Sequence, residues 1–445
     1  MPKLIAFHKL GANRDTPRVW LESQRLNASG FEPGTPFQVI PSAGRLSITR
    51  LESGKRAVSH RKAAGGLRPI IELCSAELDR FAGIETVKAK ASYGRIDITA
   101  SLRAFLIGKS RKTAPPFRTL EIFAGGGTLS EALKDNPLFQ LTTGVEIEPA
   151  FADAWGARHP EATMFQADIR AIHPAELPRF DVLVGGIPCT SHSTMGRAKK
   201  SLAGKPEEGD TGDLFLHALQ IAAHHMPAAC VFENVPNFGA SLAGSLLKTS
   251  LSHLGYELHE HILEPHECWN EPSDRRRWAL IATLHPGFCI AAPNTPFTGD
   301  LSAFLDPEMP EQDKEDALRI ANTVEGLHRH NARHAALGHG FALTTINRGS
   351  RKVPTIPKSY HKINTGPFVE TSFGLRMLRL NEVEAIMGAP AGVEHYSTGI
   401  QILGQGVQTR IWRSVLAQLG TFLENPGCQE IREELHDGQL DFRLA

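Results

Sequence analysis

Residues 119–128 read TLEIFAGGGT, an apolar run that ends in three consecutive glycines. A short apolar run followed at once by glycines is typical of a buried strand that turns tightly into a helix. Further apolar runs follow at intervals filled by helical patterns: LTTGVEI, DVLVGG, AACVFENV and RWALIAT. This alternation predicts βαβ units, and therefore an α/β fold with a parallel, doubly wound sheet, from residue 119 onward.

Three positions at the ends of these runs suit a nucleoside ligand. The first is the glycine turn at 123–128, which is expected to open a helix; its glycines allow close approach of a ligand, although any tight βα turn requires glycine. Glu146 ends the second run, where an acid grips a ribose hydroxyl in doubly wound nucleoside sites; the alternative is a surface acid. Asp168 could accept from an adenine amino group, or cap a helix. Together the three positions indicate a nucleoside cofactor.

Groups suited to catalysis follow the later runs. Cys189 lies in GGIPCTSHS, in a turn at the end of a strand, where catalytic groups of open α/β sheets gather. The alternative for a cysteine is packing in a core. Glu233 closes the strand FENV, and a buried acid there requires a polar partner. Arg275 and Arg277 alternate before WALIAT and are expected to share one face, either as ligands or as a cationic rim.

The order of these motifs resembles that of the cytosine-C5 DNA methyltransferase family over roughly residues 119–425. FAGGG resembles the first motif of that family, VEIEP its second and the dipeptide Asp168-Ile169 its third. GGIPC resembles the catalytic Pro-Cys loop, FENV the Glu-Asn-Val motif and DRRRW the Arg-x-Arg motif. Segments 376–390 and 404–407 resemble the ninth and tenth motifs. The colinear Pro-Cys, Glu-Asn-Val and Arg-x-Arg motifs are specific as a set.

The resemblance implies a DNA methyltransferase that moves a methyl group from S-adenosylmethionine to C5 of cytosine. Cys189 is then the nucleophile that adds to C6 of the base, and Glu233 bonds N3 and the amino group. Arg275 and Arg277 would hold O2 of the base or the backbone. Because C5 cannot be reached within a stacked duplex, the base is flipped out. Residues 194–212 are expected to form the mobile loop that closes on it.

The resemblance also implies which residues hold S-adenosylmethionine. Its methionine half would lie over residues 123–127, its ribose on Glu146 and its adenine beside Asp168. The full expected set is Phe123, Ala124, Gly125, Gly127, Thr128, Glu146, Ile147, Asp168, Ile169, Pro188, Leu214 and Gln405.

The sequence departs from the family pattern at three places. Thr190 follows the cysteine, and Ser273 lies two positions before Arg275, where glutamine is frequent in the family. Gln405-Gly406 stands where the last motif usually carries Asn-Ser. None of these changes removes a catalytic group; they concern loop contacts and the cofactor contacts near Gln405.

The catalytic domain is expected to be interrupted by a target-recognition region. The predicted divisions are an N-terminal β-rich domain (1–103), a linker (104–118), the catalytic domain (119–290), the target-recognition region (291–372) and a return to the catalytic domain (373–445). Residues 291–372 are rich in Pro, Gly, Thr and Asn, and their basic, Thr- and Asn-rich stretch suits phosphate contacts and base-edge readout. The spacing of Val407, Ile411, Val415 and Leu419 predicts a final helix.

Residues 1–103 contain an internal repeat. The two copies are most similar at GRLSIT (44–49) and GRIDIT (94–99). The alternating apolar residues of these segments predict half-buried strands. Each copy is expected to form a strand, a short turn or helix, a strand, a tight glycine turn and a strand. The segment 50–68 between the copies is expected to be an exposed loop. The repeat resembles AbrB-like swapped-hairpin barrels, in which two copies complete one barrel.

Charge is divided unevenly along the 445-residue chain, which carries 48 Lys+Arg and 48 Asp+Glu. Residues 1–118 hold 21 basic and 9 acidic residues, a net charge of +12, and the remainder has a net charge of −12. This division suggests that the front segment meets a polyanion. A solvated basic surface, or a docking domain for another subunit such as a companion endonuclease, is the alternative.

Composition excludes several classes of protein. The six cysteines form no CxxC pair, which argues against a disulfide framework and a structural zinc site. The absence of a long apolar run argues against a transmembrane helix or a secretory signal. Composition thus leads us to expect a cytoplasmic protein with neither metal nor membrane, and the family resemblance implies a nucleoid-associated enzyme that acts on double-stranded DNA. A restriction-modification role is expected, and the companion would be a restriction endonuclease. An RNA (tRNA) cytosine-C5 methyltransferase and a catalytically silent DNA-binding protein are the alternatives.

Overall fold

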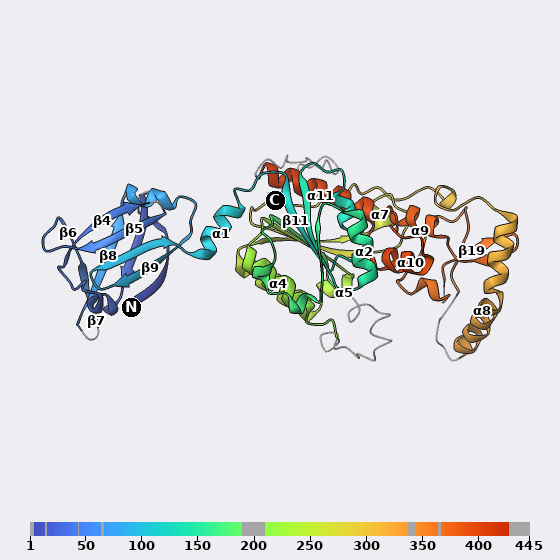
Figure 1. Ribbon diagram of the computed structural model, residues 1–445, viewed down its shortest axis with the longest axis horizontal. Coiled ribbons are helices and arrows are strands. Elements are labelled where there is room, and N and C mark those ends of the chain that lie inside the picture. The colour runs from blue at the N-terminus through green and yellow to red at the C-terminus, as the bar shows by residue number, and fades with distance from the viewer. Residues whose placement is uncertain are drawn as a thin grey trace, which may run out of the picture. The chain divides into compact units, whose positions relative to one another are not determined.

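The computed structural model describes residues 4–13, 16–42, 44–63, 66–188, 210–336, 343–363 and 366–426. The chain divides into two compact units, residues 1–112 and residues 113–445 (Figure 1). Cys189 and Thr190 lie outside the described residues, as does the expected mobile loop up to residue 209.

The first unit is built from two sheets. Their strand orders are β1-β9-β10-β5-β4-β6 and β2-β3-β8-β7. The elements are β1 (Leu4–Lys9), β2 (Gly11–Asn13), β3 (Thr16–Glu22), η1 (Gln24–Ser29), β4 (Pro36–Ser42), β5 (Arg45–Arg50), β6 (Arg56–Ala57), β7 (Ser59–Ala63), β8 (Gly66–Cys74), η2 (Ala76–Phe81), β9 (Thr86–Ser92), β10 (Arg95–Ala100) and α1 (Leu102–Ser110).

The two copies of the repeat pair with each other reciprocally. Across β5 and β10, Leu46 faces Ile98 and Ile48 faces Ile96, so each copy presents the same positions to the other. β3 and β8 pair in the same reciprocal manner. The side chains of Leu46, Ile48, Ile96 and Ile98 are buried in one core. Each copy therefore closes the core and the sheet of the other, because a single copy would leave its central strand edge unpaired.

Two connecting segments contain more regular structure than the sequence predicts. The segment 50–68, expected to be a loop, carries β6 and β7, whose side chains are mostly exposed. These strands escaped the prediction because they pair at sheet margins, where charged side chains face water on both sides. The expected linker 104–118 contains most of α1 and the first residues of β11.

The second unit contains a seven-stranded sheet with the order β13-β12-β11-β14-β15-β17-β16. Its strands are β11 (Phe117–Ile122), β12 (Phe139–Glu146), β13 (Thr163–Gln166), β14 (Val182–Gly186), β15 (Ala229–Asn234), β16 (Glu257–Leu263) and β17 (Arg277–Thr283). All five predicted apolar runs form strands of this sheet. Neighbouring strands run parallel except that β17 is antiparallel to both β15 and β16. The sheet is therefore the predicted doubly wound one, with one reversed strand.

Helices cover both faces of this sheet (Figure 1). They are α2 (Pro149–Arg158), α4 (Leu214–His225), α5 (Pro236–Gly239), α6 (Leu242–Leu254), α7 (Pro265–Cys268) and α11 (Thr409–Glu424). The apolar stripe of α11 packs on Val182, Val184 and Val231. The final helix thus forms where the spacing of apolar residues predicts it. No helix of the described ranges is long and apolar enough to cross a bilayer.

Between β17 and α11 the chain forms a smaller lobe. Its elements are η7 (Leu301–Ala303), α8 (Pro310–Ala336), β18 (Thr345–Ile346), η8 (Tyr360–Lys362), β19 (Phe368–Thr371), β20 (Gly374–Arg376), α9 (Leu380–Met387) and α10 (Tyr396–Gln405). One hydrophobic core runs through this lobe from Leu301 to Leu403. The division expected at residue 372 therefore does not coincide with a boundary of the core, because α9 and α10 pack on residues from both sides of it.

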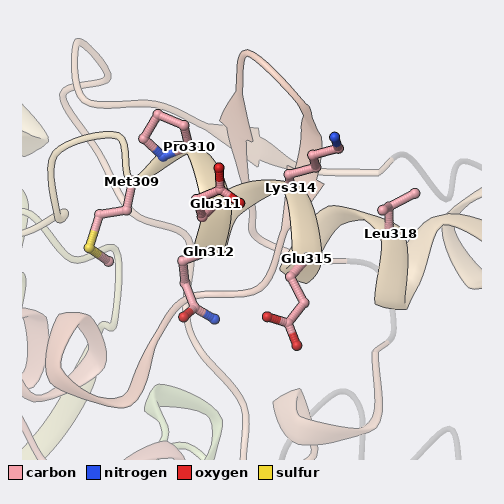
Figure 2. Close-up of a pocket in the computed structure, with 7 residues that line it drawn as sticks. All are labelled: Met309, Pro310, Glu311, Gln312, Lys314, Glu315 and Leu318. Atoms are coloured by element: carbon pink, nitrogen blue, oxygen red, sulfur yellow. The ribbon is translucent and has the colours of Figure 1, made fainter.

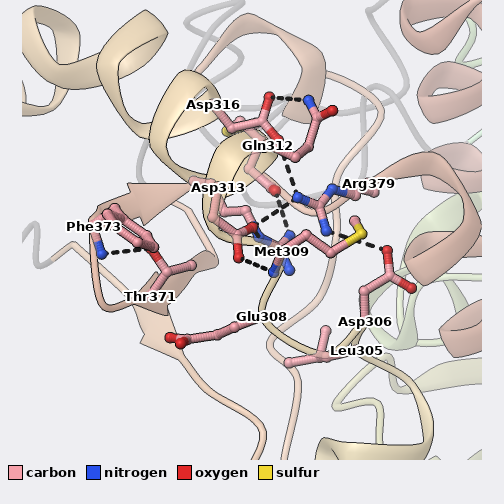
Figure 3. Close-up of polar contacts among 12 residues, drawn as sticks. Leu305, Asp306, Glu308, Met309, Gln312, Asp313, Asp316, Thr371, Phe373 and Arg379 are labelled. Carbon is pink, nitrogen blue, oxygen red and sulfur yellow. Dashed lines mark hydrogen bonds and ion pairs between the residues drawn. The ribbon is translucent and has the colours of Figure 1, made fainter.

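A cluster of buried charges fastens α8 to the start of α9. Arg376, which is 2% exposed, makes two bonds of 2.8 Å to Glu382 and an ion pair of 3.0 Å with Asp313. Figure 3 shows Arg379 lying between Asp313 and Asp306, with which it forms ion pairs of 2.7 Å and 3.3 Å. Since charges so far from water are tolerated only when they are paired, this cluster sets the position of α8.

We expect Glu382→Ala to lower the free energy of unfolding of this lobe by about 3–5 kcal/mol, because Arg376 would lose its bidentate partner in a buried site. Denaturant unfolding followed by fluorescence would measure the change. The control is Glu325→Ala, which removes an exposed ion pair with Arg329 on the same α8. Equal stability of the two variants would contradict a structural role for the buried cluster.

Candidate active site

The glycine turn after β11 has an unusual backbone. Phe123, Gly125 and Gly127 have φ values of 54°, 54° and 83°. A positive φ is strained for phenylalanine, and such strain clusters at functional sites. The turn does not open the expected α-helix: only the 3₁₀ turn η3 (Ser130–Leu133) follows. Pro137, together with the positive φ of Asp135, ends regular structure there.

The carboxylate of Glu146 fastens this turn from the neighbouring strand. Its two oxygens accept hydrogen bonds from the backbone N–H of Gly125 at 2.7 Å and from that of Glu148 at 2.8 Å. Beside it, Ile147 is 61% exposed, a large apolar side chain open to a ligand. Each carboxylate oxygen can accept more than one bond, so capacity remains for ligand hydroxyls.

The segment after α10 packs onto the same turn. Thr128 accepts a hydrogen bond from the backbone N–H of Val407 at 3.1 Å through its hydroxyl. A Cβ atom built on Gly125 would lie 3.2 Å from the amide nitrogen of Gln405. A Cβ atom on Gly406 would collide with Thr128 at 2.4 Å, so only glycine fits there. The structure thus brings Gln405 to the glycine turn.

Two ion pairs of Arg170 link Asp168, an expected cofactor residue, to the residue that precedes Leu214. Asp168 caps η4 (Ile169–Ala171) and pairs with Arg170 at 3.3 Å. Arg170 also pairs with Asp213 at 2.7 Å, immediately before α4 begins at Leu214. Ile169 is buried. Asp168 and the start of α4 are therefore held on either side of one guanidinium, and the cap that we gave as the alternative for Asp168 is formed.

Glu233 ends β15 in a buried site. Its carboxylate forms an ion pair of 2.7 Å with Arg277, and the two side chains are 9% and 12% exposed. Burial raises the pKa of the Glu233 carboxyl, against the opposing effect of the positive charges of Arg277 and Arg275. A carboxyl in this position retains a proton more readily than an exposed carboxyl does. This property suits a group that shares a proton with a nucleobase.

The neighbouring Asn234 holds the chain that leads to Cys189. Its side-chain amide donates to the carbonyl of Ile187 at 3.0 Å, and its side-chain oxygen accepts from the N–H of Val235. The N–H of Ile187 donates to the carbonyl of Glu233 at 3.2 Å. Pro188 follows and is the last described residue before Cys189. The strand end that bears Glu233 therefore also holds Ile187, which precedes Cys189 by two residues in the sequence.

Arg275 and Arg277, the two candidate arginines of SDRRR, lie in different surroundings. Arg277, the first residue of β17, points to Glu233. Arg275 is 3% exposed and donates to the carbonyls of Ile356, Gly404 and Gly406 at 2.8–3.1 Å. The expectation that both side chains share one face is not met, because Arg275 precedes the strand and turns toward the segment after α10.

Residues 117–420 match the family model described as C-5 cytosine-specific DNA methylase. The chain belongs to this C-5 cytosine-specific DNA methylase family. It is 25% identical over 281 residues to the type II methyltransferase M.MspI of Moraxella sp., a match that covers 62% of each chain. The chain thus spans about three fifths of the length of that relative. It is also 26% identical over 178 residues to the human tRNA (cytosine(38)-C(5))-methyltransferase, with 38% of this chain and 43% of that relative covered.

Solved structures resemble this methylase-family chain in fold. The S. pombe Dnmt2 methyltransferase gives a TM-score of 0.54 at 18% identity, covering 68% of this chain and 98% of that one. The Entamoeba histolytica methyltransferase EhMeth gives a TM-score of 0.55 at 18% identity, covering 69% and 97%. At such identities the likeness establishes the Rossmann-like methyltransferase fold and nothing finer.

Sequence reasoning missed three contributors to this methylase site. Glu121 lies under the glycine turn, where it accepts from the indole N–H of Trp155 at 2.6 Å and the backbone N–H of Ser130 at 3.2 Å. Burial raises the pKa of its carboxyl to about 7. An acid inside the apolar run TLEIF was the available signal. Asn234 could have been found as a polar residue closing a buried strand, whereas no local pattern pointed to Arg170.

Neither described surface pocket coincides with this site. The side chains of Met309, Glu311, Lys314 and Leu318 border a pocket along the first turns of α8 (Figure 2). A second pocket lies between later turns of α8 and β20. The described residues contain no cluster of His, Cys, Asp and Glu suited to a metal. The candidate site is therefore the set of strand ends around Glu146 and Glu233.

We expect Glu146→Gln to weaken binding of S-adenosylmethionine about tenfold or more, because the glycine turn loses a charged acceptor at its backbone N–H. Isothermal titration calorimetry would measure the dissociation constant. Glu148→Gln is the matched control, since Glu148 is exposed and its side chain caps nothing. Unchanged affinity in Glu146→Gln would contradict this assignment of the cofactor site.

Proposed function

We propose that the protein methylates C5 of cytosine in double-stranded DNA through a covalent adduct of Cys189. The observation that carries the proposal is the strand end of β15. There a buried Glu233 with a raised pKa is paired with Arg277, and Asn234 holds the chain that leads directly into Cys189. The acid and the cation are thus paired at the strand end that holds Ile187, two residues before the proposed nucleophile in the sequence, and activation of a pyrimidine ring requires all three groups.

The residues around the glycine turn fit S-adenosylmethionine. The backbone at Gly125 and Gly127 has no Cβ to block a ligand, and Glu146 retains acceptor capacity for ribose hydroxyls. The exposed Ile147 offers an apolar surface for adenine, and Asp168 and Leu214 would complete this part of the cofactor site. When bound there, S-adenosylmethionine supplies an electrophilic methyl group.

The side chains of this chain prepare the cytosine. Carbon 5 is a poor nucleophile until the Cys189 thiolate adds to C6, which moves electron density to C5. A free thiol has a pKa of about 8.5, so nearby positive charge is needed to raise the thiolate fraction. Glu233 shares its proton with N3, which neutralises the developing charge. Once C5 is methylated, loss of its proton allows the thiolate to leave by elimination.

Arg275 and Arg277 have separate roles in this proposal. Arg277 orients Glu233 through their ion pair, and we assign to it the contact with O2 of the pyrimidine. Arg275 is a positioning residue, because its donors are directed to backbone carbonyls.

DNA access requires the target base to leave the stack, at a cost of a few kcal/mol. The lobe between β17 and α11 would then read the flanking sequence, in keeping with the expected target-recognition region. The type II methyltransferases among the relatives support a restriction-modification role with a companion restriction endonuclease. Methylation of tRNA is the second candidate function, since tRNA (cytosine(38)-C(5))-methyltransferases are also relatives.

We expect Cys189→Ala to abolish methyl transfer while DNA binding is retained, because the covalent step requires the thiolate. Transfer of a labelled methyl group to duplex DNA and to tRNA, followed by bisulfite sequencing, would measure the activity and locate the modified base. Methylation of tRNA alone would indicate that the substrate is RNA. An inactive wild-type protein would favour a catalytically silent DNA-binding protein. A trapped adduct between Cys189→Ala and 5-fluorocytosine DNA would refute the nucleophile.

We expect Glu233→Gln to lower kcat by about 10²–10⁴-fold, because the amide keeps the shape but has no proton to share. The affinity for S-adenosylmethionine should change little. Single-turnover methyl transfer would measure the rate, with Glu161→Gln, an exposed acid beyond α2, as the control. Wild-type turnover of Glu233→Gln would exclude the proposed role.

A further inference from the structure

The larger sheet of the first unit has one apolar and one polar face. Along β9 and β10, residues such as Ala89, Ile96 and Ile98 point into the core, and the residues between them point outward. Side chains directly opposite each other in an antiparallel pair share a face. The strand registers therefore place Lys9, Lys88, Lys90, Arg45 and Arg95 together on the outer face of β1, β9, β10 and β5. We call these five residues the cationic face.

The cationic face carries an uncompensated charge. Asp97 is the only acid at the outward positions of its four strands, so the face has five cations, one anion and a net charge of +4. Asp97 is already engaged, since it accepts from Ser47 at 2.7 Å and pairs with Arg95 at 2.9 Å. Lys9, Lys88 and Lys90 have no ion-pair partner among the residues that the structure describes. Like charges gathered in this way repel one another unless an anion binds.

The other sheet of the same unit is different. Each of its outward arginines has an acidic partner: Arg18 pairs with Glu72 at 2.7 Å, and Arg61 and Arg68 both pair with Glu22. The lysines of the cationic face have no such partner among the described residues. That face holds +4 of the net charge of +12 that residues 1–118 carry, and its lysines remain free to meet an external anion.

The two copies of the repeat differ at two lysine positions of the cationic face. Counting by the 50-residue offset of the two copies, Lys88 and Lys90 stand where the first copy has Gln38 and Ile40. The fold therefore does not require lysine at these positions. Lys88 faces Phe7 and Lys90 faces Ile5 across β1 and β9, and these two apolar side chains are 60% and 50% exposed. Exposed aromatic side chains among cations are typical of surfaces that contact nucleic acid.

We propose that the cationic face binds the phosphodiester backbone of nucleic acid and so adds a second contact to that of the catalytic unit. Residues two apart on a strand are about 7 Å apart, and DNA carries one charge per about 1.7 Å of helix axis, so several lysines can meet phosphates at once. This contact rests on charge and register alone and does not depend on the chemistry at Cys189.

The test compares two triple variants of the full-length protein that lose the same charge. The first, Lys9→Gln/Lys88→Gln/Lys90→Gln, removes the free lysines of the cationic face. The matched control, Arg25→Gln/Lys55→Gln/Lys62→Gln, removes three exposed cations of the same unit that lie off that face and form no ion pair with any described residue. Equal thermal melting of both variants would establish that folding is intact.

Fluorescence anisotropy with a labelled 30-base-pair DNA duplex, over a series of NaCl concentrations, would measure binding. Each phosphate contact adds about 0.9 to the slope of log K against log[salt], so we expect the cationic-face variant to lower the slope by about 2–3. The control should keep the wild-type slope. Parallel titrations with single-stranded DNA and with a tRNA transcript would identify which nucleic acid the face prefers.

Several outcomes would overturn the proposal. An unchanged slope in the cationic-face variant, on every nucleic acid, would show that the face does not contact phosphates. An acidic protein partner, such as another subunit, would then be the remaining ligand for the face. An equal fall in both variants would mean that only net charge matters. The proposed catalytic function fails separately, because Cys189→Ala should keep the wild-type slope while losing methyl transfer.

Discussion

The buried guanidinium of Arg275 joins three parts of the second unit. Its donors satisfy the carbonyls of Ile356, of Gly404 in the last turn of α10 and of Gly406 just after that helix, at the point where β17 is about to enter the sheet. A charged group at 3% exposure is tolerated only because these bonds replace water. Since Gly406 packs against Thr128, the same guanidinium also sets one wall of the glycine turn.

Two glutamates at strand ends have different partners, and this difference assigns them different roles. Glu146 belongs to the proposed cofactor site, and Glu233 belongs to the proposed catalytic site. Glu146 accepts hydrogen bonds from two backbone N–H groups and so shapes the glycine turn. Glu233 is enclosed beside Arg277, and burial raises the pKa of its carboxyl. Parallel strands carry both acids to the same edge of the sheet, which is where doubly wound folds gather their ligands.

The first unit illustrates how a duplicated fold acquires an asymmetric surface. Its core depends on reciprocal pairing, so the inward residues of the two copies remain alike, as Leu46 and Ile96 do. The outward residues are not constrained by packing and differ, as Gln38 and Lys88 do. The two copies of this duplicated unit therefore resemble each other in the core and differ on the outer face.

Apolar runs and glycine turns are local patterns, so the sequence by itself determined the five strands, the glycine turn and the order of the motifs. The strands that escaped, β13 and β16, are the two edges of the sheet, where exposed polar residues weaken the apolar signal. The reversal of β17 and the different surroundings of Arg275 and Arg277 were decided only by tertiary structure. Arg275 meets Gly406 across 131 residues of chain, and no local spacing encodes a contact made by packing between such distant segments.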